Sequence, residues 1–181
     1  MNGDENWLAA LATIAVLAFY ELAVFVAQRR APERLARTAH AALRAEWFAA
    51  VSAERGTEVL AVQTLRNSLM SATMTASTAV LGLMGTATLA APSLHASLGE
   101  ATGHSTHLTV RLALELVLMA LLFASFVSSA MAVRYYNHVS FISAMPVGSE
   151  TRARWADAGT NYIRRAGLLY SWGLRQLVLV A

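Results

Sequence analysis

The stretch from residue 66 to residue 90 constrains the fold most, because it is long enough to cross a membrane and is also rich in small polar residues. After Arg66 it carries no charged side chain, and an α-helix of roughly 20 such residues crosses the ~30 Å hydrocarbon layer. Its small and hydroxyl-bearing residues are Ser68, Ser71, Thr73, Thr75, Ser77, Thr78, Gly82, Gly85, Thr86 and Thr88. In lipid such residues let helix backbones approach each other. We therefore expect this helix inside a bundle.

The composition is that of an integral membrane protein. Of the 181 residues 56% are hydrophobic and 14% charged, against about 25% charged in soluble domains. The absence of cysteine excludes thiolate metal sites and a cysteine nucleophile. The sequence also lacks a glycine-rich phosphate loop, a nucleophile elbow and paired helical histidines. We predict a protein that is not an enzyme and that needs no cofactor.

Apolar runs predict an all-α integral membrane helical bundle in one domain, residues 1–181. It has three to four transmembrane helices and a cytoplasmic amphipathic helix. The expected spans are residues 7–27, 68–90, 110–133 and 166–181. An acidic start precedes the first run, so we expect it to be retained rather than cleaved as a signal peptide.

The connecting segments have patterns of their own. Within residues 28–66, apolar residues recur every four positions around Trp47, which predicts an amphipathic helix that lies on the membrane surface or packs on the bundle. Residues 91–109 contain Pro92 and read as a loop. Residues 139–145 are too short to span, and indicate a re-entrant segment or a buried connection.

The distribution of arginine predicts the orientation. Residues 28–66 and 134–165 hold twelve of the fourteen basic residues, all of them arginine. Cytoplasmic loops carry such an excess. We therefore expect both segments in the cytoplasm of a bacterial cell, with the amino terminus outside it and the spans in the inner membrane. Because the arginines follow this membrane rule, we expect no nucleic-acid partner.

Two carboxylates are predicted at membrane depth. Glu21 lies within the first apolar run, and an intramembrane acid is either functional or paired with an arginine. Arg111 and Glu115 are four residues apart, which favours an ion pair on one helix face. The alternative for Glu115 is a place in an ion or proton path.

Hydroxyl residues of the polar helix recur at helical spacing. Ser71, Thr75, Thr78 and Gly82 are three or four residues apart, and so fall on one face. Such a stripe lines an aqueous path or serves as a packing face, since hydroxyls also bond to carbonyls of their own helix.

A polar interface motif is predicted on the cytoplasmic side. It comprises Arg66, Asn67, Arg134, Tyr135 and His138, whose donors and aromatic rings suit a membrane anchor, a helix cap or a ligand contact. The irregular group formed by His95, Glu100, His104 and His107 is a weak metal signal. We predict no metal site.

Two stretches resemble an uncharacterised family of small membrane proteins of bacteria and plants, domain of unknown function 599. They are RNSLMSATMTASTAVLGLMG at residues 66–85 and RYYNHVSFISAMP at 134–146. The positions that match the second family motif are Arg134, Tyr135, His138, Phe141 and Pro146. The resemblance implies a four-helix architecture and no particular activity.

These observations favour a homo-oligomeric channel-like or transporter-like protein for a small ion. The hydroxyl stripe, Glu21 and Glu115 support this hypothesis. The alternative is an accessory or assembly subunit that docks on a larger membrane complex through the same small-residue face.

Overall fold

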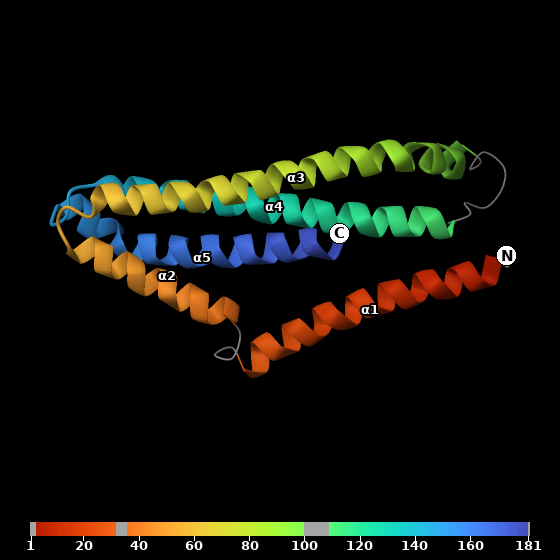
Figure 1. Ribbon diagram of the computed structural model, residues 1–181, viewed down its shortest axis with the longest axis horizontal. Coiled ribbons are helices and arrows are strands. Elements are labelled where there is room, and N and C mark those ends of the chain that lie inside the picture. The colour runs from red at the N-terminus through yellow and green to blue at the C-terminus, as the bar shows by residue number, and fades with distance from the viewer. Residues whose placement is uncertain (1–2, 32–35, 100–108, 181) are drawn as a thin grey trace.

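The structure, a computed structural model that describes residues 3–31, 36–99 and 109–180, consists of five helices (Figure 1). They are α1 (Gly3–Arg30), α2 (Ala36–Ala53), α3 (Glu58–Gly99), α4 (Val110–Ala144) and α5 (Glu150–Val180). The described residues contain no strand. The prediction of an all-α helical bundle is confirmed.

Three of the helices are long and apolar enough to cross a membrane. They are Asn6–Arg30, Glu58–His95 and Val110–Ala144, in α1, α3 and α4. The chain is thus a multi-pass membrane protein. The fourth predicted span, residues 166–181, falls largely in α5, which is not among the three.

Several helices are longer than the sequence pattern indicated. The expected loop at residues 91–109 is wrong in its first part, because α3 continues through Pro92 to Gly99; residues 100–108 lie outside the described residues. A membrane helix tolerates a proline. Residues 139–144 extend α4 rather than forming a segment of their own. α5 is likewise one helix across the expected boundary at residue 166.

The bundle is formed by α3, α4 and α5, which run side by side, with α2 packed on α5 (Figure 1). The starts of α3 and α5 meet the ends of α2 and α4 at one end of the bundle (Figure 1), which we call the arginine-rich end. With 42 residues, α3 is about 63 Å long, whereas the hydrocarbon layer is ~30 Å thick. The bundle therefore extends well beyond the lipid core.

The hydrophobic core lies toward the arginine-rich end. It includes Phe48 of α2, Leu65 of α3, Tyr136 of α4 and Ile163 of α5, each at most 2% exposed. The buried face of α2 comprises Ala41, Ala45, Phe48 and Val51. Of the two interpretations of this amphipathic helix, the structure supports packing on the bundle.

Helix α1 stands apart from the other helices. Only 6% of its most apolar 18-residue stretch is buried. In Figure 1 the helix diverges from α3, α4 and α5 along most of its length. Its faces are apolar, with Leu8, Val16 and Phe19 largely exposed. Lipid contact suits such a surface.

Candidate functional site

The predicted hydroxyl stripe is divided between two faces of α3. Thr75 is 7% exposed and lies with Ala72 and Ala79 on the buried face. Ser71 and Thr78, on the adjoining part of the helix surface, are exposed. Gly82 is half-buried against α4, where an added Cβ would lie 3.0 Å from Leu122 Cδ2. The stripe is therefore not one continuous lining within a single copy.

The hydroxyls of α3 donate to carbonyls one turn back on the same helix. Ser71 Oγ donates to Asn67 O at 3.1 Å and Thr78 Oγ1 to Met74 O at 2.9 Å. Buried Thr75 makes the same bond to Ser71 O at 3.0 Å. A hydroxyl has one proton and two acceptor lone pairs, so the exposed oxygens of Ser71 and Thr78 present acceptors outward.

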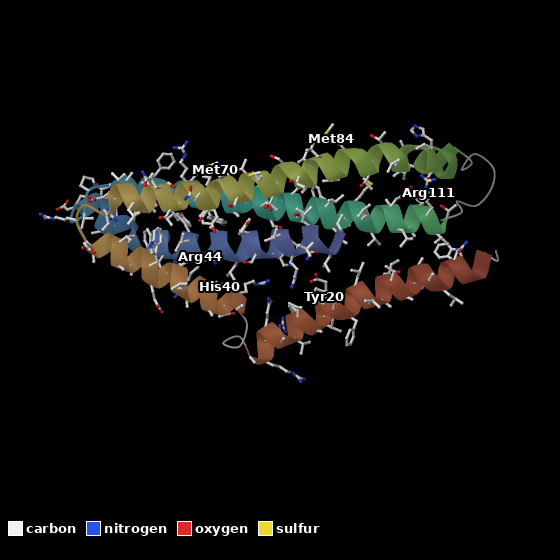
Figure 2. All side chains as sticks on the ribbon, in the orientation of Figure 1. Tyr20, His40, Arg44, Met70, Met84 and Arg111 are labelled. Atoms are coloured by element: carbon white, nitrogen blue, oxygen red, sulfur yellow. The ribbon has the colours of Figure 1, made fainter. Side chains whose placement is uncertain are left out.

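The exposed face of α3 has a regular repeat. Its residues alternate steps of three and four and are all exposed; they are Ser71, Met74, Thr78, Leu81, Gly85 and Thr88, which we call the α3 seam. A Cβ at Gly85 would meet nothing within 4 Å. In Figure 2 the neighbouring Met70 and Met84 point away from the other helices. This spacing is that of a coiled-coil contact, with small residues at every seventh position.

Glu21 joins α1 to α5. Its Oε2 accepts from Arg175 Nη2 at 2.8 Å and its Oε1 from Gln176 Nε2 at 2.9 Å. The Arg175 guanidinium also lies 5.9 Å from the centre of the Tyr20 ring. Burial lowers the pKa of nearby Arg37, as does Arg175, while Glu21 raises it. Of the two readings of Glu21, the structure shows the pairing with an arginine of another helix.

We expect Glu21→Ala to release α1 from the bundle, because the bridge supplies its polar contacts with α5. Each charge-assisted bond contributes about 1.5–3 kcal/mol, less here because the Glu21 side chain is 35% exposed. The chain has no cysteine, so single cysteines in α1 and α5 allow spin-label distance measurements. The distance distribution should broaden.

The matched control is Glu115→Ala, because its ion pair lies within one helix. Arg111 Nε lies 2.7 Å from Glu115 Oε1, so this loss should leave the α1–α5 distance unchanged. Equal broadening in both variants would contradict an anchoring role for Glu21.

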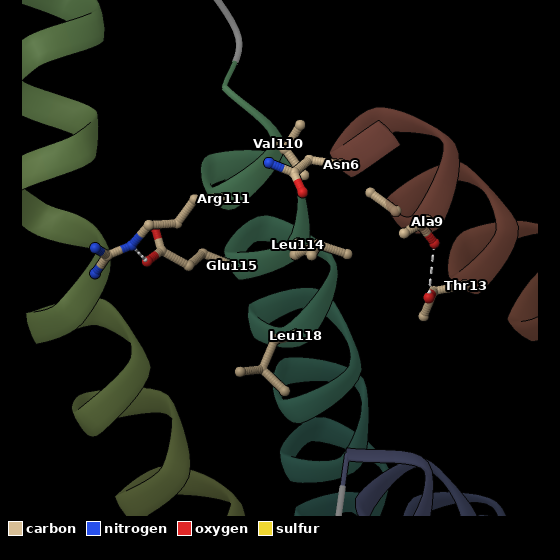
Figure 3. A pocket seen from close by; sticks show the side chains of 9 residues that line it. Asn6, Ala9, Thr13, Val110, Arg111, Leu114, Glu115 and Leu118 are labelled. Atoms are coloured by element: carbon tan, nitrogen blue, oxygen red, sulfur yellow. Dashed lines mark hydrogen bonds and ion pairs between the residues drawn. The ribbon is translucent and has the colours of Figure 1, made fainter. Parts of the chain in front are cut away.

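Arg111 and Glu115 also line a cleft of about 590 Å³ between the starts of α1 and α4. Figure 3 shows Asn6 and Thr13 of α1 on one side and the ion pair on α4. The Arg111 side chain is 68% exposed and that of Glu115 13%. Glu115 Oε2 is buried without a hydrogen-bond partner in the described part of the chain. The predicted ion pair is present.

The interface motif divides into exposed charges and an aromatic cluster. Arg66, Asn67 and Arg134 are exposed. Tyr135 and His138 meet Tyr162 of α5, with ring centroids 5.6 and 5.7 Å apart. Tilted aromatic pairs at such distances stabilise a contact by about 0.5–1.5 kcal/mol. The motif thus contributes to the α4–α5 contact.

Buried serines on α4 are residues that sequence reasoning did not single out. Ser125, Ser128 and Ser129 are at most 2% exposed, and Ser125 Oγ donates to Gly173 O of α5 at 2.8 Å. A Cβ on Gly173 would lie 2.7 Å from Ser129 Oγ. The signal was present as three serines at helical spacing in an apolar helix.

Two arginines inside the bundle, one buried and one half-buried, were also missed. Arg152 is 4% exposed, and its guanidinium donates to Met145 O at 2.6 Å, Ser143 O at 3.2 Å and Val51 O at 3.2 Å. Arg44 of α2 reaches across to α5, against Gly167. Sequence alone does not distinguish these arginines from exposed ones on the same helices.

The described residues contain no cluster of three or more His, Asp or Glu side chains able to hold a metal ion. Glu100, His104 and His107 lie outside the described residues. The ring Nδ1 of His95 lies 2.7 Å from Ala91 O.

Comparison with known proteins assigns nearly the whole chain to one family. No curated protein and no solved structure matches the chain. The family model described as "Protein of unknown function, DUF599" matches residues 8–181, which confirms the resemblance seen at residues 66–85 and 134–146. The chain belongs to the DUF599 family.

Proposed function

We propose that this protein is a non-enzymatic, homo-oligomeric membrane protein whose α3 helices associate through the α3 seam and line a channel-like path for a small cation. The observation that carries the proposal is the heptad-like repeat of small residues, Ser71, Thr78 and Gly85, on an exposed face. Small residues at a helix surface in lipid are typical of helix association.

A second copy of the chain suits this seam. Copies inserted with the same orientation lie parallel, so the same residues of α3 meet at the same depth around a symmetry axis. Ser71, Thr78 and Gly85 leave space at every second turn, and Met74 and Leu81, each about 70% exposed, fill the positions between them. This alternation supports close packing of identical helices.

The hydrogen bonds of the seam favour a cation as the permeating species. Ser71 and Thr78 use their protons in bonds to Asn67 O and Met74 O. Their remaining lone pairs are acceptors, which replace water around a cation and repel an anion. Glu21 and Glu115 are engaged by arginines, so the proposed path uses hydroxyl oxygens instead.

The arginine distribution supports the cytoplasmic side for the arginine-rich end and the bacterial inner membrane as the location. In that orientation α2 and the start of α5 face the cytoplasm. The amino terminus is then on the outer side.

The test compares two neighbouring threonines of α3, of which Thr78 is exposed and Thr75 is buried. Thr78→Val keeps the shape and removes a seam hydroxyl, so cation flux into proteoliposomes should fall by roughly tenfold, the effect of about 1.4 kcal/mol on a barrier. Thr75→Val removes a buried hydroxyl that is outside the seam and should leave flux unchanged. Equal flux in the wild type and both variants, or none in the wild type, would contradict the path.

A groove between α3 and α4 favours a second candidate, an accessory subunit docked on a larger complex. It encloses about 470 Å³ and its wall includes the small residues Ala76, Ser77 and Ala130, which admit a foreign helix closely. The discriminating measurement is the mass of the complex extracted gently from native membrane. A homo-oligomer supports the seam, and a stoichiometric second protein supports the groove.

A further inference from the structure

A cleft at the arginine-rich end is formed by four helices and is separate from the α3 seam. It has a volume of about 330 Å³, and its lining residues are Leu43, Arg44, Trp47, Thr64, Leu65, Ser68, Tyr136 and Ile163. Ligand sites are typically clefts of about 300–1,000 Å³ with mainly apolar walls and a few polar groups. Here Arg44 is the one charged residue of the lining.

Arg44 is held in the cleft wall with unused hydrogen-bonding capacity. Its Nη1 atom is buried and has no hydrogen-bond partner among the described residues. The guanidinium packs on Gly167 of α5, where a Cβ would come within 2.8 Å of Arg44 Cζ. Glycine at this position therefore leaves room for the cation. Arg44 as a whole is only half-buried and lines the cleft, so an anion there can pair with the guanidinium and offset the cost of holding this charge among apolar residues.

The position of the cleft indicates where the anion comes from. Three helices carry an exposed arginine one or two residues from the cleft lining, namely Arg66 on α3, Arg134 on α4 and Arg164 on α5. Arginines that flank the apolar run of a membrane helix mark the headgroup level of the membrane. The lining thus lies at the level of lipid phosphates. Exposed Leu43, 62% accessible, and the Trp47 ring provide apolar contact for an acyl chain.

We propose that the Arg44 cleft binds the phosphate of an anionic phospholipid. The guanidinium donates paired N–H groups to phosphate oxygens, a geometry that suits arginine better than lysine. The hydroxyls of Ser68 and Tyr136 lie in the same lining and complete a polar wall around the headgroup. Basic pockets between membrane helices recognise such headgroups.

The test measures lipid retained by the purified chain. Protein is extracted from membranes containing phosphatidylglycerol and phosphatidylethanolamine, delipidated stepwise in detergent and weighed intact by native mass spectrometry. The wild type should retain phosphatidylglycerol, and Arg44→Met should lose roughly tenfold or more in affinity, the effect of one charge-assisted contact. Arg134→Met, a loss of equal charge at the same end but outside the lining, should retain the lipid.

Further variants separate binding from folding and lipid from free phosphate. Arg44→Lys keeps the charge without the fork and should show an intermediate loss, with a melting temperature like that of the wild type. Ser68→Ala should weaken retention without changing the helical content. Equal loss in Arg44→Met and Arg134→Met, retention of phosphatidylethanolamine instead, or calorimetric binding of inorganic phosphate at the cleft without lipid retention would each overturn the proposal.

Discussion

Replacing Arg152 with alanine should unfold the arginine-rich end of the bundle, the largest effect we expect from a single side chain. Its guanidinium joins carbonyls at the ends of two helices, Val51 of α2 and both Ser143 and Met145 at the end of α4. Hydrogen bonds to a charged group contribute about 1.5–3 kcal/mol each, and the side chain is 4% exposed. A loss of at least ~3 kcal/mol follows, because these bonds are not fully additive.

Two variants make this prediction specific. Arg152→Lys should recover little of the stability that Arg152→Ala loses, since one ammonium group cannot donate to both helix ends as the planar guanidinium does. Arg154→Ala removes an exposed arginine two residues away and should change stability by less than ~0.5 kcal/mol. Thermal unfolding in detergent, followed by circular dichroism, gives all three values. A melting temperature of Arg152→Ala equal to that of Arg154→Ala would contradict a stabilising role for the Arg152 hydrogen bonds.

Gly173→Leu should separate α5 from α4, the second large effect. Even a Cβ at this position would lie 2.7 Å from Ser129 Oγ and 3.0 Å from the backbone oxygen of Ser125, so a larger side chain forces the helices apart and breaks the Ser125 bond to Gly173 O. Overpacking of a tight contact costs about 1–3 kcal/mol or more. Loss of the folded peak in size-exclusion chromatography and of thermal stability is the expected result.

Gly85→Leu is the matched control, because a Cβ there meets nothing within 4 Å. The isolated chain should keep its melting temperature in detergent, while association through the α3 seam should weaken. Leucine raises helix propensity at both positions, so equal destabilisation by the two glycine variants would contradict the α4–α5 contact as the cause of the loss.

The class of fold could be predicted from the sequence because the length of each hydrophobic run must match the thickness of the bilayer. Few structures other than helices satisfy this requirement. The spans around Glu21 and Ser125 follow directly from it. The ends of the helices were harder to predict. Pro92 and the start of the polar segment after Arg134 are local signals, whereas α3 and α4 continue past them because their neighbours in the bundle support extra turns.

The hydroxyl stripe shows why the candidate site was only partly predictable. Spacing placed Ser71, Thr75 and Thr78 on one side of a helix, but such a side is broad and does not say where a neighbour begins. The edge of α4 falls between them, so Thr75 is buried and the other two are exposed. The burial of Arg44 and Arg152 depends likewise on helices that are far away in the sequence.

The glycine contact of α5 has a consequence for biosynthesis. Unlike α1, α3 and α4, this helix is not among the candidate spans, and it carries Arg175 and Gln176 near its end. We expect this helix to dock its Gly173 face on α4 after that helix is embedded, the second of two stages. Until it docks, its contact face is unshielded, so we expect variants that weaken this contact to lower the amount of mature protein in the membrane.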